Sequence, residues 1–194
     1  MPIEIELKAH AGNPELVKSR LDELAEFSAA IEKKDVYWFP SAGGLEKTLP
    51  SSGIRVRKES ITDAAGKCSH VVLVTYKNKE RRDGIEVNDE YEFEVSSAEV
   101  FEDMLGCLGL EPGIAKHKKG WAWKFRGVTA ELVRVDGLGW FVELEIIADR
   151  ADREASAEGR KQLLGLFDKL GIERKNIEER YYTEMLKALN GITV

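Results

Sequence analysis

The sequence is poor in cysteine, in basic clusters and in long apolar runs, and each shortage excludes a class of protein. Its two cysteines, Cys68 and Cys107, lack the spacing of a zinc site, so we expect two free thiols in a reducing compartment. The purest apolar run, residues 71–74, is far shorter than the roughly 18 residues of a membrane span. The first residues lack the basic and apolar regions of a signal peptide. We therefore expect a soluble, cytoplasmic protein with no membrane partner.

The charge balance is acidic, with 29 Lys and Arg residues against 35 Asp and Glu residues and a net charge of −6. An acidic chain without a basic block is a poor general binder of nucleic acid or of anionic membranes. At 43% hydrophobic residues the chain is too apolar to be disordered. Its length suits a single domain over residues 1–194.

Alternation of apolar and polar residues predicts strands along most of the chain. The clearest strands lie at residues 2–8, 53–58, 71–77, 90–95, 121–126 and 140–147, with weaker ones at 35–39, 114–119 and 129–135. Helices are expected after Asn13, after Ser96 or Ser97, and over residues 153–170 and 180–189. Loops are expected at residues 41–53, 61–69 and 79–88. This order predicts an α+β fold with an antiparallel sheet or barrel of about eight strands.

One face of these strands carries the charge, because successive side chains of a strand point to opposite faces. Eight acidic and eight basic residues share that face: Glu4, Glu6, Glu90, Glu92, Glu94, Glu131, Glu143 and Glu145, with Lys8, Arg55, Arg57, Lys77, Lys116, Lys118, Lys124 and Arg126. A solvated outer face of an antiparallel sheet would alternate in the same way. Two features favour a charged interior instead. The charges come in pairs of like sign, and amphipathic helices must cover the apolar face; in the second helix the buried side is expected to be Val100, Phe101, Met104, Leu105 and Leu108.

A closed barrel of about eight strands has room for its side chains and one small ligand. Paired carboxylates together with paired cations suit a ligand that brings charges of both signs, such as a polyphosphate bound to divalent cations. Carboxylate oxygens are suited to Mg²⁺ or Mn²⁺, while Arg and Lys hold phosphate oxygens. The pattern therefore predicts a site for a nucleoside or inorganic triphosphate.

A series of short motifs points to one family. The motifs that follow one another along the chain are E-I-E-L-K at 4–8, D-V-Y-W-F at 35–39, G-I-R-V-R at 53–57, V-T-Y-K at 74–77, E-Y-E at 90–92 or E-F-E at 92–94, and K-H-K at 116–118. They resemble, in family order, the strands of the CYTH superfamily, the triphosphate tunnel metalloenzymes. Residues 136–145 and 182–186 resemble the class IV adenylate cyclase branch of that superfamily.

The resemblance implies a closed, antiparallel, eight-stranded β-barrel with helices packed outside, metal-dependent chemistry and a homodimer. Carried over by position, the Mg²⁺ or Mn²⁺ ligands are Glu4, Glu6, Glu90, Glu92, Glu143 and Glu145. The triphosphate-binding residues are Lys8, Arg55, Arg57, Lys77, Lys116 and Lys118. Glu6, Lys116 and Glu143 are the expected catalytic residues.

Two positions depart from the family's pattern. Lys118 replaces an arginine, which keeps the charge and loses the planar fork of donors. Val133 stands where the cyclase branch has an acidic residue, three positions before Asp136. Glu131, on the same strand face, is a candidate substitute for that missing carboxylate.

Three functions stay open on these residues. The first expectation is a class IV adenylate cyclase, which converts ATP to cyclic AMP and pyrophosphate, as residues 136–145 and the closing helix favour. An inorganic tripolyphosphatase or thiamine triphosphatase would use the same cage with water as the nucleophile, and a binding module without turnover is the third reading, motivated by Val133. His10, His70 and His117 are scattered and predict no histidine site.

Overall fold

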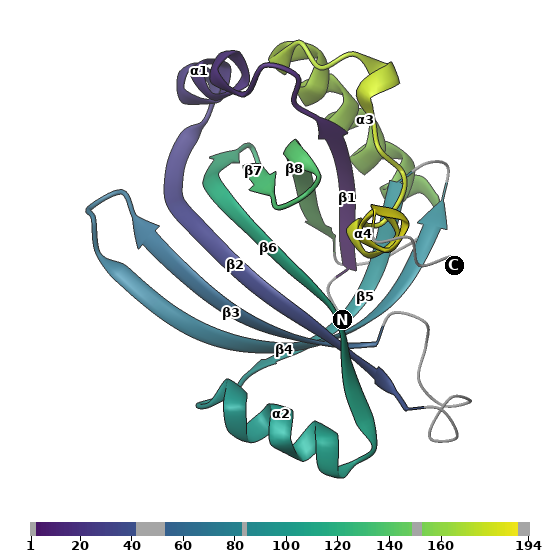
Figure 1. Ribbon diagram of the computed structural model, residues 1–194. Coiled ribbons are helices and arrows are strands. Elements are labelled where there is room, and N and C mark those ends of the chain that lie inside the picture. Colours follow the sequence, from purple (N-terminus) through teal and green to yellow (C-terminus); the bar gives the residue numbers. More distant parts are fainter. Residues whose placement is uncertain (1–2, 42–52, 83–84, 149–152, 190–194) are drawn as a thin grey trace.

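The computed structural model describes residues 3–41, 53–82, 85–148 and 153–189, with the side chains of residues 3, 77–82, 85, 87–90 and 153 left aside. Within these residues the chain forms eight strands and four α-helices (Figure 1). The strands are β1 (Ile3–His10), β2 (Glu26–Pro40), β3 (Ile54–Asp63), β4 (Cys68–Arg82), β5 (Ile85–Glu94), β6 (Leu110–Phe125), β7 (Val128–Val135) and β8 (Gly139–Ala148). The helices are α1 (Pro14–Leu24), α2 (Ala98–Cys107), α3 (Arg153–Leu170) and α4 (Tyr182–Leu189), with a short 3₁₀ helix at Arg174–Asn176.

Neighbouring strands pair antiparallel in the order β1-β5-β4-β3-β2-β6-β7-β8. Because β1 also pairs with β8, the pairing pattern is that of a closed barrel. The α+β class and the eight-stranded antiparallel sheet expected from the sequence are therefore confirmed.

The main apolar core lies on the outer face of the sheet, beneath α1 and α3, which pack against each other (Figure 1). Leu21 of α1 and Phe167 of α3 are fully buried there against Leu132 and Leu144. The start of α1 follows the expected chemistry, since the Asn13 side chain accepts a hydrogen bond from the Leu16 backbone N–H. With this face covered by helices, the charged residues of β1, β7 and β8 must point the other way.

Helix α2 lies at the opposite end of the sheet, against β3 and β6 (Figure 1). The Ser97 hydroxyl caps it by accepting from the Val100 N–H. The expectation of a broad buried side on this helix is wrong, because Val100, Met104 and Leu108 are 61%, 54% and 64% exposed. Leu105 is buried and Phe101 packs at the edge of that cluster, so the helix covers the sheet with a narrower stripe than its sequence predicts.

Several strands are longer than the sequence predicts. The expected loop at residues 79–88 is wrong, because β4 continues to Arg82 and β5 begins at Ile85. The loop expected at 61–69 is also shorter than predicted, since β3 continues to Asp63 and β4 begins at Cys68. The loop expected at 41–53 lies almost wholly outside the described residues.

The two strands expected around Gly120 form one strand, β6. A Cβ atom at Gly120 would lie 1.9 Å from the Leu132 carbonyl oxygen, so this glycine permits a close approach of β7 and does not end the strand. None of the helices in the described ranges is long and apolar enough to cross a membrane.

Candidate functional site

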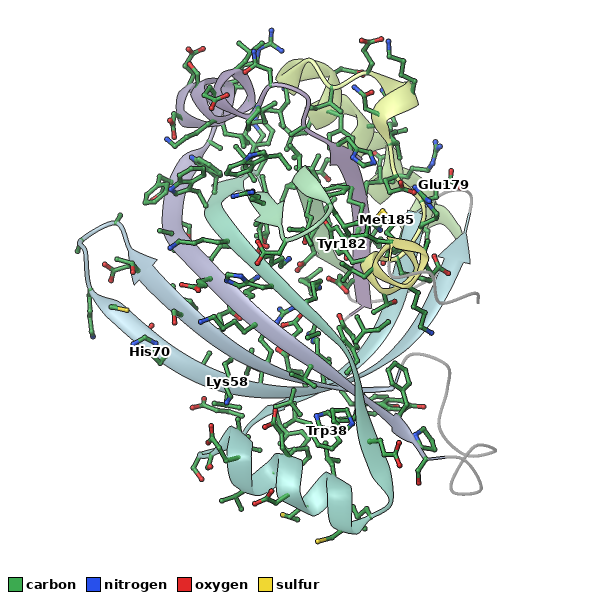
Figure 2. The ribbon with its side chains drawn as sticks, viewed as in Figure 1. Trp38, Lys58, His70, Glu179, Tyr182 and Met185 are labelled. Carbon is green, nitrogen blue, oxygen red and sulfur yellow. The ribbon has the colours of Figure 1, made fainter. Side chains whose placement is uncertain are left out.

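A cavity of about 340 Å³ lies on the inner face of the sheet, and every one of the eight strands contributes a side chain to its wall. The charged residues that line it are Glu4, Glu6, Lys8, Lys33, Arg55, Arg57, Glu59, Glu86, Glu92, Lys116, Lys118, Glu131, Glu143 and Glu145. Tyr181, Tyr182 and Thr183, at the start of α4, close part of it. In Figure 2 Tyr182 and Met185 lie on α4 beside β1. We call this space the charged cavity.

Strand register brings the acidic residues of β1, β7 and β8 together. Glu6 is paired with Glu145, and Lys8 and Glu131 are each paired with Glu143 on the two sides of β8. Directly opposed residues on neighbouring strands have Cβ atoms roughly 4.5–5.5 Å apart, so like charges at such pairs repel unless cations separate them. The alternation of the sequence therefore places carboxylates close enough to need counter-ions.

Lysine side chains supply those counter-ions at the centre of the wall. Lys118 Nζ donates to Glu143 at 2.6 Å and to Glu131 at 3.1 Å, and Lys33 Nζ donates to Glu131 at 2.6 Å. Burial alone would raise the pKa of the Glu131 carboxyl, but Lys118 and Lys33 outweigh it and hold that pKa far below its usual value. The pKa of Glu143 is lowered in the same way, chiefly by Lys118. Both carboxylates are thus ionised at neutral pH.

A second buried group joins β2, β3 and β6. Arg57 donates two hydrogen bonds to Asp35, at 2.7 and 2.9 Å, and Lys116 Nζ lies 3.0 Å from the same carboxylate. Burial opposes ionisation of Asp35, yet Arg57 and Lys116 hold its pKa well below the usual value. Asp35 therefore fixes the direction in which Arg57 and Lys116 enter the cavity.

The closing helix also contacts the acidic wall. Tyr182 donates a hydrogen bond to Glu143 at 2.8 Å, and the Lys116 ammonium lies 5.0 Å from the centre of the Tyr182 ring. Burial and the neighbouring Glu143 carboxylate raise the pKa of Tyr182 well above its usual value. The phenol therefore stays protonated and acts as a donor.

The site residues predicted from the sequence are mostly brought together. Ten of them line the charged cavity: Glu4, Glu6, Lys8, Arg55, Arg57, Glu92, Lys116, Lys118, Glu143 and Glu145. Lys77 and Glu90 are paired across β4 and β5, but their side chains fall outside the described part of the chain. Lys124 is exposed, but it is paired with Thr129 of the cavity wall and donates to its hydroxyl at 2.7 Å, so it lies at the edge of the charged face. Arg126 is exposed in a turn with a φ of 49°, so its placement on a charged interior is wrong.

Three charged residues of the wall escaped the sequence-based prediction. Lys33 and Glu59 continue the alternation of Asp35 and Arg57 by one step, and the expected strands stop just short of them. Glu86, which forms a salt bridge with Lys8, falls in the segment expected to be a loop. Extending each alternation by two residues would have found the first two.

The surroundings of Val133 differ from what a missing metal ligand implies. Val133 is 0% exposed and belongs to an apolar cluster with Phe141 and Met185. Glu131 does reach the charged cavity, but it is engaged by Lys33 and Lys118. Val133 is thus part of a buried apolar cluster beneath α4, which we call the apolar closure; its members are Ala29, Ile31, Ala122, Val133, Val135, Phe141, Tyr182 and Met185.

The carboxylates provide the hard oxygen donors that Mg²⁺ and Mn²⁺ prefer. Glu4, Glu6, Glu143 and Glu145 lie on two neighbouring strands and face one cavity, so their chemistry fits such an ion. Within the described ranges, no three acidic, histidine or cysteine side chains converge closely enough to hold an ion. A lysine occupies part of this donor set, since Lys118 binds Glu143.

Comparison with known proteins agrees with this arrangement. Residues 2–182 match the CYTH domain. A protein of Pyrococcus horikoshii OT3 is similar in structure at 24% identity and a TM-score of 0.77, over 95% of this chain and 98% of its own. A second protein of that organism is 28% identical, with a TM-score of 0.73 over 93% of this chain and 98% of its own.

A Vibrio parahaemolyticus protein, named as a proposed adenylate cyclase, is 21% identical with a TM-score of 0.75 over 95% of this chain and 98% of its own. No curated protein sequence matches the chain.

Proposed function

The chain belongs to the CYTH family, whose enzymes act on triphosphates, and from this premise we propose that it is a metal-dependent triphosphate hydrolase working in the charged cavity. The main observation behind this proposal is the charge of the cavity wall, where, among the described residues, eight carboxylates face six Lys and Arg side chains. This excess of two negative charges repels a bare polyphosphate anion. The substrate is therefore expected to enter with divalent cations that satisfy the carboxylates.

The basic residues are arranged to hold a phosphate chain. Arg57 and Lys116 enter the cavity side by side from Asp35, and Lys118 lies beside them on β6. Arginine can bind phosphate oxygens with two parallel donors, and each lysine adds a point charge. These groups would stabilise the negative charge that develops on the leaving phosphate.

Glu4, Glu6, Glu143 and Glu145 are the residues proposed to hold Mg²⁺ or Mn²⁺. A bound divalent ion would supply charge neutralisation of the phosphate oxygens and activation of the attacking water. The lowered pKa of Glu143 keeps that carboxylate ionised, as a metal ligand requires. Tyr182 and Lys118 hold its two oxygens in fixed directions.

Hydrolysis is preferred over cyclisation because of the apolar closure around Val133. A cyclase has to hold a ribose hydroxyl beside the metal, and the acidic residue that the cyclase branch places here is replaced by a buried valine. Adenylate cyclase activity remains the second candidate, favoured by the turn at Gly137–Gly139 and the closing helix. The Vibrio neighbour carries a cyclase name, but 21% identity shows a shared fold alone.

Product analysis by chromatography tests the proposal. Purified protein is incubated with tripolyphosphate, thiamine triphosphate and ATP, each in Mg²⁺ and then Mn²⁺. Release of orthophosphate without cyclic AMP is expected. Cyclic AMP with pyrophosphate would establish the cyclase instead, and a raised melting temperature without turnover would establish a binding module.

The Glu6→Ala variant tests the site assignment in the same assay. Removing a proposed metal ligand is expected to lower turnover by about a hundredfold or more. Asp103→Ala on α2 is the control, since that carboxylate is exposed and is not among the residues that line the charged cavity. Unchanged turnover in Glu6→Ala, with a melting temperature equal to that of the parent, would reject this site.

A further inference from the structure

A second cavity, of about 610 Å³, lies on the opposite face of the sheet from the charged cavity. Its walls come from β2, β3 and β4 on one side and from β6, β7 and β8 on the other. Residues that alternate with those of the charged cavity line it; Glu32 and His117, for example, are the sequence neighbours of Lys33 and Lys118. We call this space the outer groove. None of the proposed triphosphate chemistry uses it.

Three side chains that carry chemistry meet at the β3–β4 end of the outer groove. The Cys68 thiol lies 3.7 Å from His70 Nε2, and His70 Nδ1 lies 2.9 Å from the Ser60 hydroxyl. Strand register explains the cluster, because Ser60 is paired with His70 across the hairpin and Cys68 stands two residues before His70 on the same face. Figure 2 shows His70 on this hairpin, well away from Tyr182 and Met185.

The geometry gives His70 the position of a general base for a thiol. When Nδ1–H donates to Ser60 Oγ, Nε2 carries no proton and faces Cys68 Sγ. Cys68 is exposed, so a reagent can reach the sulfur atom from solvent. A histidine held by a third group and set beside a thiol is the arrangement that makes a cysteine nucleophilic.

We propose that Cys68 is a reactive thiol of the outer groove, which exchanges with small anionic disulfides and forms a reversible mixed disulfide there. His70 Nε2 takes the thiol proton, and the Cys68 sulfur attacks one sulfur of the disulfide. A new S–S bond forms to Cys68 while the old S–S bond breaks. The other half leaves as a thiolate and takes up the proton, so the cysteine is oxidised and the released half is reduced.

The remaining walls of the groove select the class of disulfide. Trp121 and Trp140 stand parallel, with ring centres 5.9 Å apart, and provide an apolar surface. Lys119 and Arg134 add exposed positive charge to the same wall. The acidic residues of the groove, Glu32 and Asp136, are both hydrogen-bonded to His117, at 3.0 and 2.8 Å. Lys119 lies 3.9 Å from Glu32, whereas no ion pair is found for Arg134 among the described residues. The groove thus suits a disulfide that sets an apolar body against the tryptophans and a carboxylate against Arg134.

The second cysteine of the chain provides a matched control. Cys107 is also exposed, but it ends α2, and no hydrogen bond to a histidine is found for it among the described residues. Single-thiol proteins are made as Cys107→Ser, which leaves Cys68, and Cys68→Ser, which leaves Cys107. Each is mixed with the anionic aromatic disulfide dithiobis(nitrobenzoate) or with neutral hydroxyethyl disulfide, and the rate of thiol release is measured at pH 7.

Cys68 is expected to react at least about tenfold faster than Cys107, with a larger ratio for the anionic reagent. Adding His70→Asn to the Cys68 protein should lower its rate about tenfold and leave its melting temperature unchanged. The same change in the Cys107 protein should have no effect. Equal rates at the two cysteines, or a Cys68 rate that does not respond to His70→Asn, would overturn the proposal. If the ratio of the Cys68 rate to the Cys107 rate is the same for the anionic and the neutral reagent, the choice of an anionic disulfide is overturned.

Discussion

Two regions of the sheet interior, built from the same strands, have opposite chemistry. On β7 the inward side chains change from Glu131 to Val133 in one step of the alternation, and on β8 they change from Glu143 to Phe141. One region is the charged cavity. The other, an apolar closure beneath α4, consists of Ala29, Ile31, Ala122, Val133, Val135, Phe141, Tyr182 and Met185.

The comparison teaches what each region needs in order to stay buried. Carboxylates such as Glu131 persist in the interior because lysines neutralise them and hydrogen-bond to them. The apolar closure needs no partners and gains stability from removal of its surface from water. Tyr182 belongs to both regions, since its ring packs against Phe141 and its hydroxyl binds Glu143. The boundary between the two regions therefore runs through one side chain of α4.

The largest effect is expected from placing a charge in the apolar closure. Val133→Asp would bury a carboxylate opposite Phe141, in a cluster of apolar side chains. We expect the free energy of unfolding to fall by about 4 kcal/mol, measured by chemical denaturation. An acidic residue at position 133, as in the cyclase branch, is therefore expected to destabilise this protein rather than to raise its turnover.

Thr129→Asp is the matched control for that substitution. Thr129 lies on the same face of β7, lines the charged cavity and accepts a hydrogen bond from Lys124 at 2.7 Å. A carboxylate there has Lys124 at hand and stands opposite Glu145, so attraction and repulsion offset each other and a change within about 1 kcal/mol is expected. Equal losses in the two variants would contradict the division of the interior into two regions.

The sequence predicts the direction of the side chains better than the length of the elements. The alternation of side chains along each strand placed Glu4, Glu6, Arg57 and Glu143 on one face, and this two-residue period does not depend on the neighbouring strands. It could not tell where that face becomes apolar, since this depends on α4, which packs over the interior from the far end of the chain.

The same limit explains the errors. Residues 79–88 are polar apart from Ile85 and Val87 and were expected to be a loop, yet β4 and β5 pair through them as far as Arg82 and Ile85. In α2 the apolar stripe is real in the sequence, but the sheet beneath it covers only part of the stripe. A pattern of alternation shows which residues can be buried, and tertiary contacts decide which of them are.

A smaller loss is expected from opening the buried ion cluster of β2, β3 and β6. Asp35→Asn would leave Arg57 and Lys116 buried beside a neutral amide. We expect the free energy of unfolding at pH 7 to fall by about 3 kcal/mol. Because the pKa of Asp35 is depressed in the folded protein, its contribution is complete above its unfolded value of about 3.8 and is lost as the pH falls toward the folded value.

The pH dependence separates this charge effect from simple loss of packing. Melting temperatures of the parent and Asp35→Asn proteins should converge as the pH falls below about 3.8 toward the folded pKa of Asp35. A gap between the two proteins that stays constant from pH 7 into this range would show that the carboxylate charge is not what stabilises the cluster.

The smallest effect concerns the residue shared by the two regions. Tyr182→Phe keeps the ring against Phe141 and beneath Lys116, and removes only the hydrogen bond to Glu143. Glu143 keeps Lys118 as a partner, so we expect a loss of about 1.5 kcal/mol in the free energy of unfolding. Tyr182→Leu removes the ring as well and should cost more, because it also weakens the apolar closure. If both variants lose the same stability, the hydroxyl alone links α4 to the sheet; if Tyr182→Phe loses none, the closure holds α4 without the charged cavity.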